Sequence, residues 1–274
     1  FDVAEVIRLT ARYGSLDTIE DDYGINLMPL ITFAITTYEN DPAVPFIPKG
    51  TKPENYSDAN VRLMTMIHKA IAVISFKLEG QLVMRNPDFD MSHRLLLDKI
   101  DYEKGTIFID GADYPLKDYY FPTIDPKNPY ALTPEEELVM NKLTSSFLNS
   151  AKLQDDVSFL FAKGSVYLVY NNNLMLHGCI PMKSETEFKE FNHKGRMVKG
   201  KELLDALEQT IRNVWVNRFN QTNNDGDYFW YLWCGACSPI FGKHRMATFE
   251  RYLIEDKGPQ SERLDLYYSL RNNV

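Results

Sequence analysis

The stretch NVRLMTMIHKAIAVISFKLEG, residues 60–80, decides much of the fold. Its apolar residues recur at helical spacing in one continuous stripe, formed by Leu63, Ile67, Ala70, Ile74 and Leu78. Apolar residues also occupy the other faces of this helix, so the sequence predicts a long helix that is buried on several sides. Ser57 or Asp58 can cap its first turn.

Two shorter helices are predicted before this stretch. Residues 1–13, FDVAEVIRLTARY, place apolar side chains at near-helical spacing, and Gly14 suits a left-handed C-cap. Residues 27–38 form a second apolar run, in which Pro29 is tolerated because it lies in the first helical turn. The prolines of residues 41–58 then predict an extended connector between two substructures.

A hairpin and two helices are predicted after the long helix. Residues 105–116, GTIFIDGADYPL, alternate as a strand does, and Asp110-Gly111 suits a turn that needs positive φ. Thr133, followed by Pro134 and three glutamates, marks a strong helix start. Helices are therefore predicted over residues 134–150 and 153–162.

The chain becomes richer in strands beyond residue 163. Residues 164–182, GSVYLVYNNNLMLHGCIPM, predict two antiparallel strands that turn at Asn171 to Asn173. A short hairpin over 188–198 turns at His193 to Gly195, and an amphipathic helix follows over 200–216. Residues 248–257, TFERYLIEDK, predict a further strand before a terminal helical segment. The fold class predicted from these elements is α+β.

Composition limits the classes of partner. The chain has 274 residues, of which 44% are hydrophobic, so it can bury a core of one large domain or two. Thirty basic and 38 acidic residues give a net charge of −8, which disfavours nucleic acid and anionic membrane surfaces as partners. Three cysteines cannot build a disulfide framework and fit a reducing compartment, so a cytoplasmic location is expected. No stretch predicts a transmembrane helix.

His177 is the most suggestive position for chemistry. It stands at the carboxyl end of a predicted strand and is followed by Gly178, which allows backbone or ligand to approach closely. An imidazole held at a strand end suits a divalent metal ion. A single histidine in a strand is, however, more often a hydrogen-bonded core residue, so the pattern alone leaves both interpretations open.

Two other groups are weaker candidates. Cys234 and Cys237 form a CxxC, which serves zinc and thiol redox sites, but no second pair completes a zinc site and two half-buried thiols are the simpler interpretation. Lys243, His244 and Arg245 form a basic cluster after turn-forming residues, which suits either a phosphate or a solvated surface turn. No common nucleotide-binding or hydrolase motif occurs.

Six stretches, in the same order, resemble the class III fructose-1,6-bisphosphatases of Firmicutes and related bacteria, from the first residues to the last. The stretches are ARYGSLDTIEDDYGINLMPL, HKAIAVISFKLEGQL, RLLLDKIDYEKGTIFIDGADYPL, FPTIDPKNPYALTPEEE, LHGCIPM and YLWCGACSPIFGKHRMATFERYLIEDK. The resemblance implies a calcineurin-like metallophosphoesterase core with large insertions. It also implies hydrolysis of the 1-phosphate of fructose 1,6-bisphosphate in gluconeogenesis, with a divalent metal, usually manganese.

The resemblance assigns roles to three residues. It implies that His177 is a metal ligand of the intact enzyme, and it favours Lys243 and Arg245 as residues that bind the sugar phosphate. The other metal motifs of the superfamily, DxH, GDxxDRG, GNHD and a late GHxP or GHxH, are missing from these residues. The absence of an initiator Met and the helical pattern at Phe1 agree with this, so we expect an internal fragment that is inactive alone.

The expected organisation has three parts. Residues 1–40 would continue from a missing phosphoesterase core, residues 41–163 would form a mostly helical insertion with a small hairpin, and residues 164–274 would hold part of the phosphoesterase β-sandwich. Two rival hypotheses remain at this level: a non-catalytic helical interaction or regulatory module, and a CxxC thiol or zinc protein. The sequence leaves a homo-oligomer open.

Overall fold

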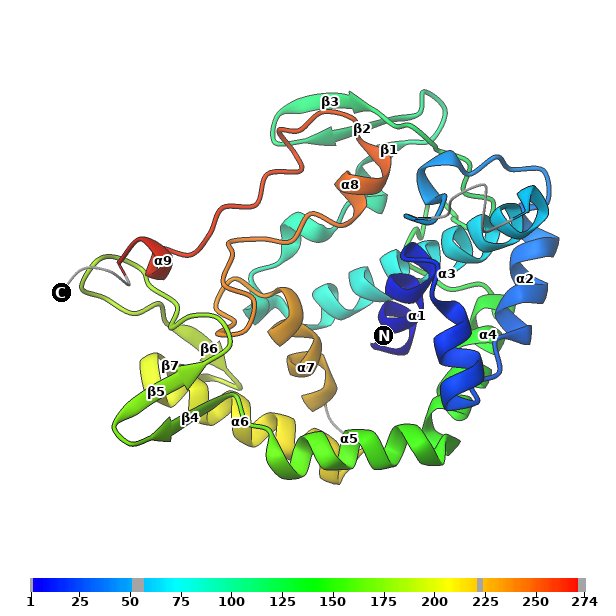
Figure 1. Ribbon diagram of the computed structural model, residues 1–274. Coiled ribbons are helices and arrows are strands. Elements are labelled where there is room, and N and C mark those ends of the chain that lie inside the picture. Colours follow the sequence, from blue (N-terminus) through cyan, green and yellow to red (C-terminus); the bar gives the residue numbers. More distant parts are fainter. Residues whose placement is uncertain (1, 51–56, 221–223, 271–274) are drawn as a thin grey trace. The chain divides into compact units, whose positions relative to one another are not determined.

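The computed structural model describes residues 2–50, 57–220 and 224–270 (Figure 1). Contacts group the chain into two compact units. Unit 1 comprises residues 1–85, 92–156 and 248–260, and unit 2 comprises residues 86–91, 157–247 and 261–274. Helices and small antiparallel sheets confirm the α+β class. The three-part organisation expected from sequence stays a prediction.

Unit 1 is mainly helical, with one three-stranded antiparallel sheet of order β1-β2-β3. Its elements are α1 (Asp2–Arg12), a π-helical turn (Thr18–Asp22), α2 (Met28–Tyr38), α3 (Asp58–Arg85), β1 (Ile100–Asp101), β2 (Thr106–Ile109), β3 (Ala112–Pro115), α4 (Pro134–Asn149) and α8 (Phe249–Leu253), with 3-10 turns at Val44–Phe46, Ser92–Arg94 and Leu97–Lys99. Helix α5 (Ala151–Lys163) begins in unit 1 and ends in unit 2.

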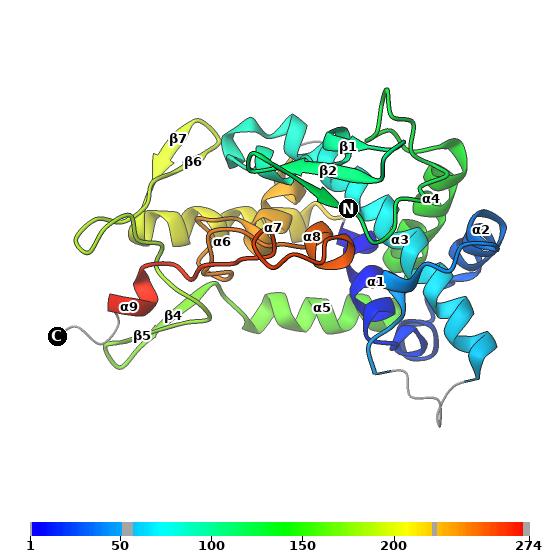
Figure 2. The ribbon, with the colours of Figure 1, turned by 90° about the horizontal axis from the view of Figure 1, so that it is seen from above.

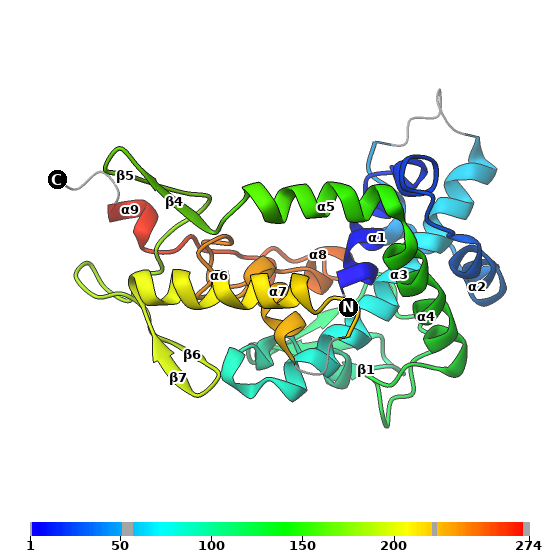
Figure 3. The same ribbon diagram turned by 90° about the horizontal axis from the view of Figure 1, so that it is seen from below.

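Unit 2 contains two separate two-stranded hairpins and three helices. Its elements are a 3-10 turn (Pro87–Phe89), β4 (Tyr167–Tyr170), β5 (Asn173–Leu176), β6 (Phe191–His193), β7 (Arg196–Val198), α6 (Gly200–Val216), α7 (Asp225–Cys234) and α9 (Tyr267–Leu270). Helices α6 and α7 pack together (Figure 3). The rings of Phe89, Phe191 and Tyr231 lie within 4.5–6.2 Å of one another, centroid to centroid, and form an aromatic core.

Helix α3 organises unit 1 because it is buried on more than one side, as its sequence predicted. Ile67, Ala70 and Ile74 join a cluster with α1, α2 and α4. Val73 and Phe76 join a second cluster with the β1-β2-β3 sheet and α8 (Figure 2). The Asn60 amide donates to Ser57 Oγ at 3.2 Å, so Ser57 caps the first turn of the helix.

Most of the local signals are confirmed by backbone geometry. Gly14 has φ +66°, as a left-handed C-cap requires. The β2-β3 turn has φ +50° at Asp110 and +87° at Gly111, and the β4-β5 turn uses two asparagines with positive φ. Thr133 and Glu136 form a complete capping box at the start of α4. The glycine, asparagine and aspartate residues of these turns therefore adopt the positive φ angles that the sequence predicted.

The strand predicted over 248–257 is wrong, because residues 249–253 form helix α8. Phe249, Tyr252 and Leu253 are spaced by three and four residues, and all three are buried in the core. Only Ile254 pairs as a strand residue, in a single bridge with Leu116. The β-branched and aromatic composition suggested a strand, and packing on α3 favoured a helix.

Predictions that involve Phe1, residues 51–56 of the connector and the terminal residues 271–274 lie outside the described residues.

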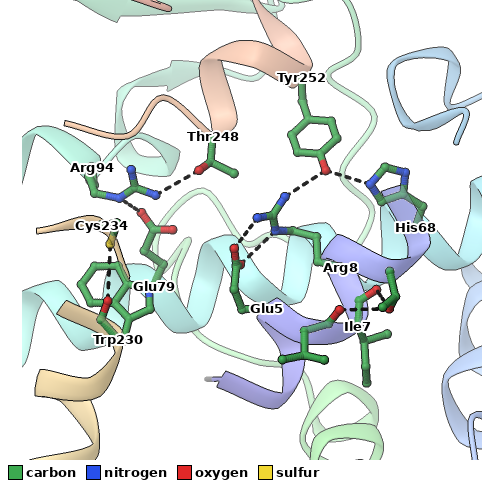
Figure 4. Close-up of polar contacts among 12 residues, drawn as sticks. Glu5, Ile7, Arg8, His68, Glu79, Arg94, Trp230, Cys234, Thr248 and Tyr252 are labelled. Carbon is green, nitrogen blue, oxygen red and sulfur yellow. Dashed lines mark hydrogen bonds and ion pairs between the residues drawn. The ribbon is translucent and has the colours of Figure 1, made fainter. Parts of the chain in front are cut away.

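Four buried side chains of α3 are titratable, and each has a partner from another segment. The fully buried Lys69 ammonium donates to the carboxylates of Asp41 and Asp118. Lys77 donates to Glu136 Oε2 at 2.7 Å and to the Thr123 carbonyl at 2.6 Å. Glu79 accepts from Arg94, which also donates to Thr248 Oγ1 at 3.3 Å (Figure 4). These bonds join the helix to segments distant in sequence.

The fourth, His68, belongs to a chain of hydrogen bonds that fixes α8 (Figure 4). His68 Nδ1 lies 2.6 Å from the Phe46 carbonyl, which only accepts, so Nδ1 carries the proton. Nε2 therefore accepts from the Tyr252 hydroxyl at 2.8 Å. That hydroxyl accepts from Arg8, whose guanidinium is paired with Glu5. Every member of this chain is satisfied, which a buried network requires.

Among the helices of the described residues, none is both long and apolar enough to span a membrane.

Lys77→Met should lower the free energy of unfolding by about 3 kcal/mol, because it leaves the Glu136 carboxylate buried without its cation. Lys77→Met combined with Glu136→Gln should recover part of that loss, since Gln keeps an acceptor for the Thr133 amide. The measurement is urea unfolding followed by circular dichroism. Lys201→Met, which breaks the exposed pair with Asp205, is the control and should change stability by less than about 1 kcal/mol. Equal effects of Lys77→Met and Lys201→Met on the free energy of unfolding would contradict the stabilising role of the buried Lys77–Glu136 pair.

Stability should fall as the pH drops below about 6.5, because burial, reinforced by the positive charges of Arg8 and Arg12, lowers the pKa of His68 to about 3. The unfolded chain binds the proton near pH 6.5 and the folded chain does not, so this group's contribution is complete above 6.5 and is lost toward pH 3. The expected slope is about 0.7 kcal/mol per pH unit at pH 6.5 and approaches about 1.4 kcal/mol per pH unit at pH 5. His68→Gln should flatten that slope in urea unfolding, and an unchanged slope would refute the role of His68.

Candidate functional site

His177 lies directly after β5, in a bend, with its side chain exposed. The strand end predicted from sequence is confirmed, whereas its role as a ligand stays a prediction. The next two residues fix the path of the chain. The Cys179 amide donates to the Pro239 carbonyl at 2.9 Å, and a Cβ on Gly178 would lie 2.5 Å from the Pro239 carbonyl oxygen and 2.8 Å from that of Ile240. Only glycine allows this approach of two backbones.

The loop that receives Gly178 is held by Ser238, which is buried. The Ser238 hydroxyl donates to the Leu232 carbonyl at 2.6 Å and accepts from the amides of Ile240 and Phe241 at 3.1 and 3.2 Å. Gly242, with φ +65°, ends this turn. The His177 loop therefore rests on a rigid turn that leads directly to Lys243.

The basic residues predicted to bind phosphate are engaged with residues 261–264. Lys243 donates to Glu262 Oε2 at 2.7 Å, and Arg245 Nε donates to the Ser261 carbonyl at 3.2 Å. Glu262 is nearly buried and its other oxygen accepts from the Ala247 amide. A phosphate at Lys243 would have to compete with this carboxylate, so phosphate binding by Lys243 and Arg245 remains an untested prediction.

Asp265 is a residue of this region that sequence reasoning missed. Its buried carboxylate accepts from the Met182 amide at 3.0 Å and from the Lys189 ammonium at 2.7 Å. Asp265 therefore joins the segment that follows His177, at Met182 and Lys189, to the chain near residue 265. An aspartate flanked by leucines carries no motif, so only its burial with two donors reveals the role.

The described residues do not form a metal centre by themselves. Within residues 2–50, 57–220 and 224–270, no group of three or more His, Cys, Asp or Glu side chains is arranged to hold a metal ion. His177 would supply one imidazole, and one imidazole binds a hard divalent cation weakly. Any metal site that includes His177 therefore needs further ligands.

The CxxC has the environment of structural thiols. Cys234 is the last residue of α7, where the helix dipole disfavours a thiolate, and its Sγ bonds the Trp230 carbonyl at 3.7 Å. Burial raises the pKa of the Cys237 thiol, and that of Cys179 to about 12. None of the three cysteines forms a disulfide. Protonated thiols are poor nucleophiles and poor metal ligands, which favours the simpler interpretation of Cys234 and Cys237.

Comparison with known proteins gives the class first. Relatives named "Fructose-1,6-bisphosphatase class 3" match nearly the whole chain: one from Clostridium novyi is 50% identical over 273 residues, one from Listeria innocua is 48% identical over 271 residues, and one from Bacteroides thetaiotaomicron is 46% identical over 273 residues. These alignments include 98–99% of this chain. By name, these relatives are a class of bisphosphatases.

The particular family follows from a second comparison. The sequence model described as Firmicute fructose-1,6-bisphosphatase matches residues 1–274, so the chain belongs to that family. The resemblance seen in the sequence is thereby confirmed. The chain spans only 41–42% of the length of the three relatives. No solved structure matches the chain.

Gly178→Ala should destabilise unit 2 by about 2 kcal/mol, because the added methyl group meets two backbone carbonyls that cannot move away. Hydrogen exchange of the Cys179 amide should accelerate, since its bond to Pro239 would lengthen. Gly258→Ala is the matched control, because its added methyl group meets only the end of the Asp256 side chain. If both variants are equally stable, the close approach at Gly178 is not a constraint.

Proposed function

We propose that this chain is part of a divalent-metal-dependent fructose-1,6-bisphosphatase, which hydrolyses the 1-phosphate of fructose 1,6-bisphosphate in gluconeogenesis. The observation that carries the proposal is the match of the family model to residues 1–274. A cytoplasmic location is part of the proposal and accords with the free cysteines. Oligomeric state stays open.

The β4-β5 hairpin supports the proposal that unit 2 contributes to a larger phosphoesterase sheet. Its pairs Leu168–Met175 and Val169–Leu174 place apolar side chains on both faces, and Leu168 and Val169 are 54% and 59% exposed. Two-stranded hairpins are marginally stable alone, and exposed edges invite a further strand. The longer relatives contain residues beyond those that align with this chain. We propose that such residues pack on the exposed hairpin and pair with its edges.

His177 is proposed as one ligand of the metal centre, with manganese as the ion. Its place after a strand and its exposure suit an imidazole that completes a site built from several loops. Because the described residues hold no further ligand set, no step of the hydrolysis is assigned to this chain. Lys243 and Arg245 are proposed to bind a phosphate of the substrate, after Lys243 leaves Glu262.

His177→Ala should weaken Mn²⁺ binding by at least about tenfold in a protein with the length of the relatives, because an imidazole ligand is lost. Titration calorimetry with Mn²⁺ measures this directly, and the rate of phosphate release from fructose 1,6-bisphosphate should fall in parallel. The 274-residue chain alone should release no phosphate.

His244→Ala is the control for metal binding, because the His244 ring bonds the Arg263 backbone. It should leave Mn²⁺ affinity unchanged. Unchanged Mn²⁺ affinity in His177→Ala would refute the ligand assignment, whereas the absence of fructose 1,6-bisphosphate hydrolysis by the longer wild-type protein would refute the proposed activity itself.

A further inference from the structure

Unit 1 contains a large open cavity that the proposed phosphatase chemistry does not use. Its volume is about 790 Å³, which is within the usual range for small-molecule sites. Two proline-containing loops form its walls, residues 40–45 and residues 117–126. The side chains that matter are Asn40, Asp41, Asp118, Tyr119, Tyr120 and Phe121.

The second loop is held rigid by α3. From Lys117 to Thr133 the chain runs without a helix or paired strand of its own, and loops of this length within compact domains are commonly functional. Three side chains on α3 fix it: Lys69 bonds Asp118, Lys77 bonds the Thr123 carbonyl, and Gln81 bonds the Tyr130 carbonyl at 2.7 Å. Burying two ammonium groups carries a desolvation penalty, and both groups bond this loop. The conformation of the loop therefore matters.

Two tyrosines form half-exposed platforms at the mouth of the cavity. The Tyr119 ring lies against Gly105, where a Cβ would approach within 2.6 Å of ring atoms, so one face is packed while the residue stays 49% exposed. The Tyr120 ring centroid lies 5.5 Å from the Lys69 ammonium, and Tyr120 is 53% exposed. Each tyrosine is thus packed against a neighbour and is still about half exposed, which leaves ring surface for stacking.

The charges at the cavity balance. Asp41 and Asp118 contribute two negative charges, and Lys69 beneath them and Lys117 at the rim contribute two positive ones. A ligand that carries a phosphate would meet two carboxylates, and a cation would compete with Lys69 in its own cage of rings. Asp118 Oδ1 accepts from the Tyr120 amide and Oδ2 from Lys69, and each oxygen keeps a second lone pair that a hydroxyl group can use. The Asn40 amide can donate or accept. The cavity therefore favours a neutral ligand with hydroxyl groups.

We propose that this cavity binds a neutral sugar of one or two rings. The apolar C–H face of such a ring would stack on Tyr119 and Tyr120, because aromatic faces are negative and C–H edges are weakly positive. Its hydroxyl groups would donate to Asp118 and exchange hydrogen bonds with Asn40. The inference does not depend on the phosphatase assignment, since no residue proposed for metal or phosphate binding lines the cavity.

Saturation-transfer NMR on the purified chain tests the proposal, with D-glucose, D-fructose and maltose as neutral probes and fructose 6-phosphate and choline as charged probes. A neutral sugar should receive saturation more strongly than either charged probe. The double variant Tyr119→Ala/Tyr120→Ala should weaken its binding by about tenfold, because two stacking contacts are lost. Asn40→Ala should weaken it as well, while keeping the aromatic wall.

The control is Tyr13→Ala/Tyr170→Ala, which removes two exposed tyrosines that do not line the cavity and should leave sugar binding unchanged. Circular dichroism checks that each variant is folded, and Asn40→Ala serves as the decisive variant if the tyrosine pair proves necessary for folding. Failure of all three neutral sugars to receive saturation would overturn the proposal. Stronger transfer to choline or fructose 6-phosphate, or sugar binding that survives in Asn40→Ala and in a folded double variant, would overturn it too.

Discussion

The two lysines buried in α3 need acidic and carbonyl partners, and the other segments of unit 1 supply them. Lys69 draws together the start of the 41–46 turn and the loop at Asp118, and Lys77 holds the same loop and the N-terminus of α4. An ammonium that lost its partner would remain buried and charged, so the arrangement must be adopted as a whole. The chain of bonds from Arg8 through Tyr252 to His68 extends this constraint to α8, which returns to unit 1 after 91 residues that belong to unit 2.

Unit 2 is organised by backbone contact more than by buried charge. Gly178 lies against the Pro239 turn, Ser238 holds that turn, and Asp265 fixes the segment after Cys179. These contacts fix the backbone beside His177 without using the His177 side chain, which stays exposed. The proposed metal site rests on this exposed imidazole, and the proposed larger sheet rests on the exposed β4-β5 hairpin.

Local chemistry made many elements predictable from the sequence. Thr133 with Glu136, Asp110-Gly111 and the three asparagines at 171–173 act within a few residues, so their turns and caps need no distant partner. The helix at 249–253 was missed because its two aromatic residues and the flanking β-branched Thr248 and Ile254 favour strands locally. Only the structure shows that Phe249, Tyr252 and Leu253 are buried together on one helical face. The sequence identified His177 by its position after a strand, but Asp265 carried no local pattern. The stripe in α3 predicted burial on several sides, which already implies that its polar residues must be buried as well.

The sequence by itself determined the family, most of the helical and hairpin segments, and the central place of α3, because family likeness, periodicity and turn chemistry are all read along the chain. Only the tertiary structure decided which carboxylates meet Lys69 and Lys77, that Lys243 is paired with Glu262, and that two proline-containing loops enclose a cavity faced by Tyr119 and Tyr120. The physical reason is that a buried charge must have a partner, but its own position in the sequence does not determine which residue that partner is. The partner is chosen when the whole core packs.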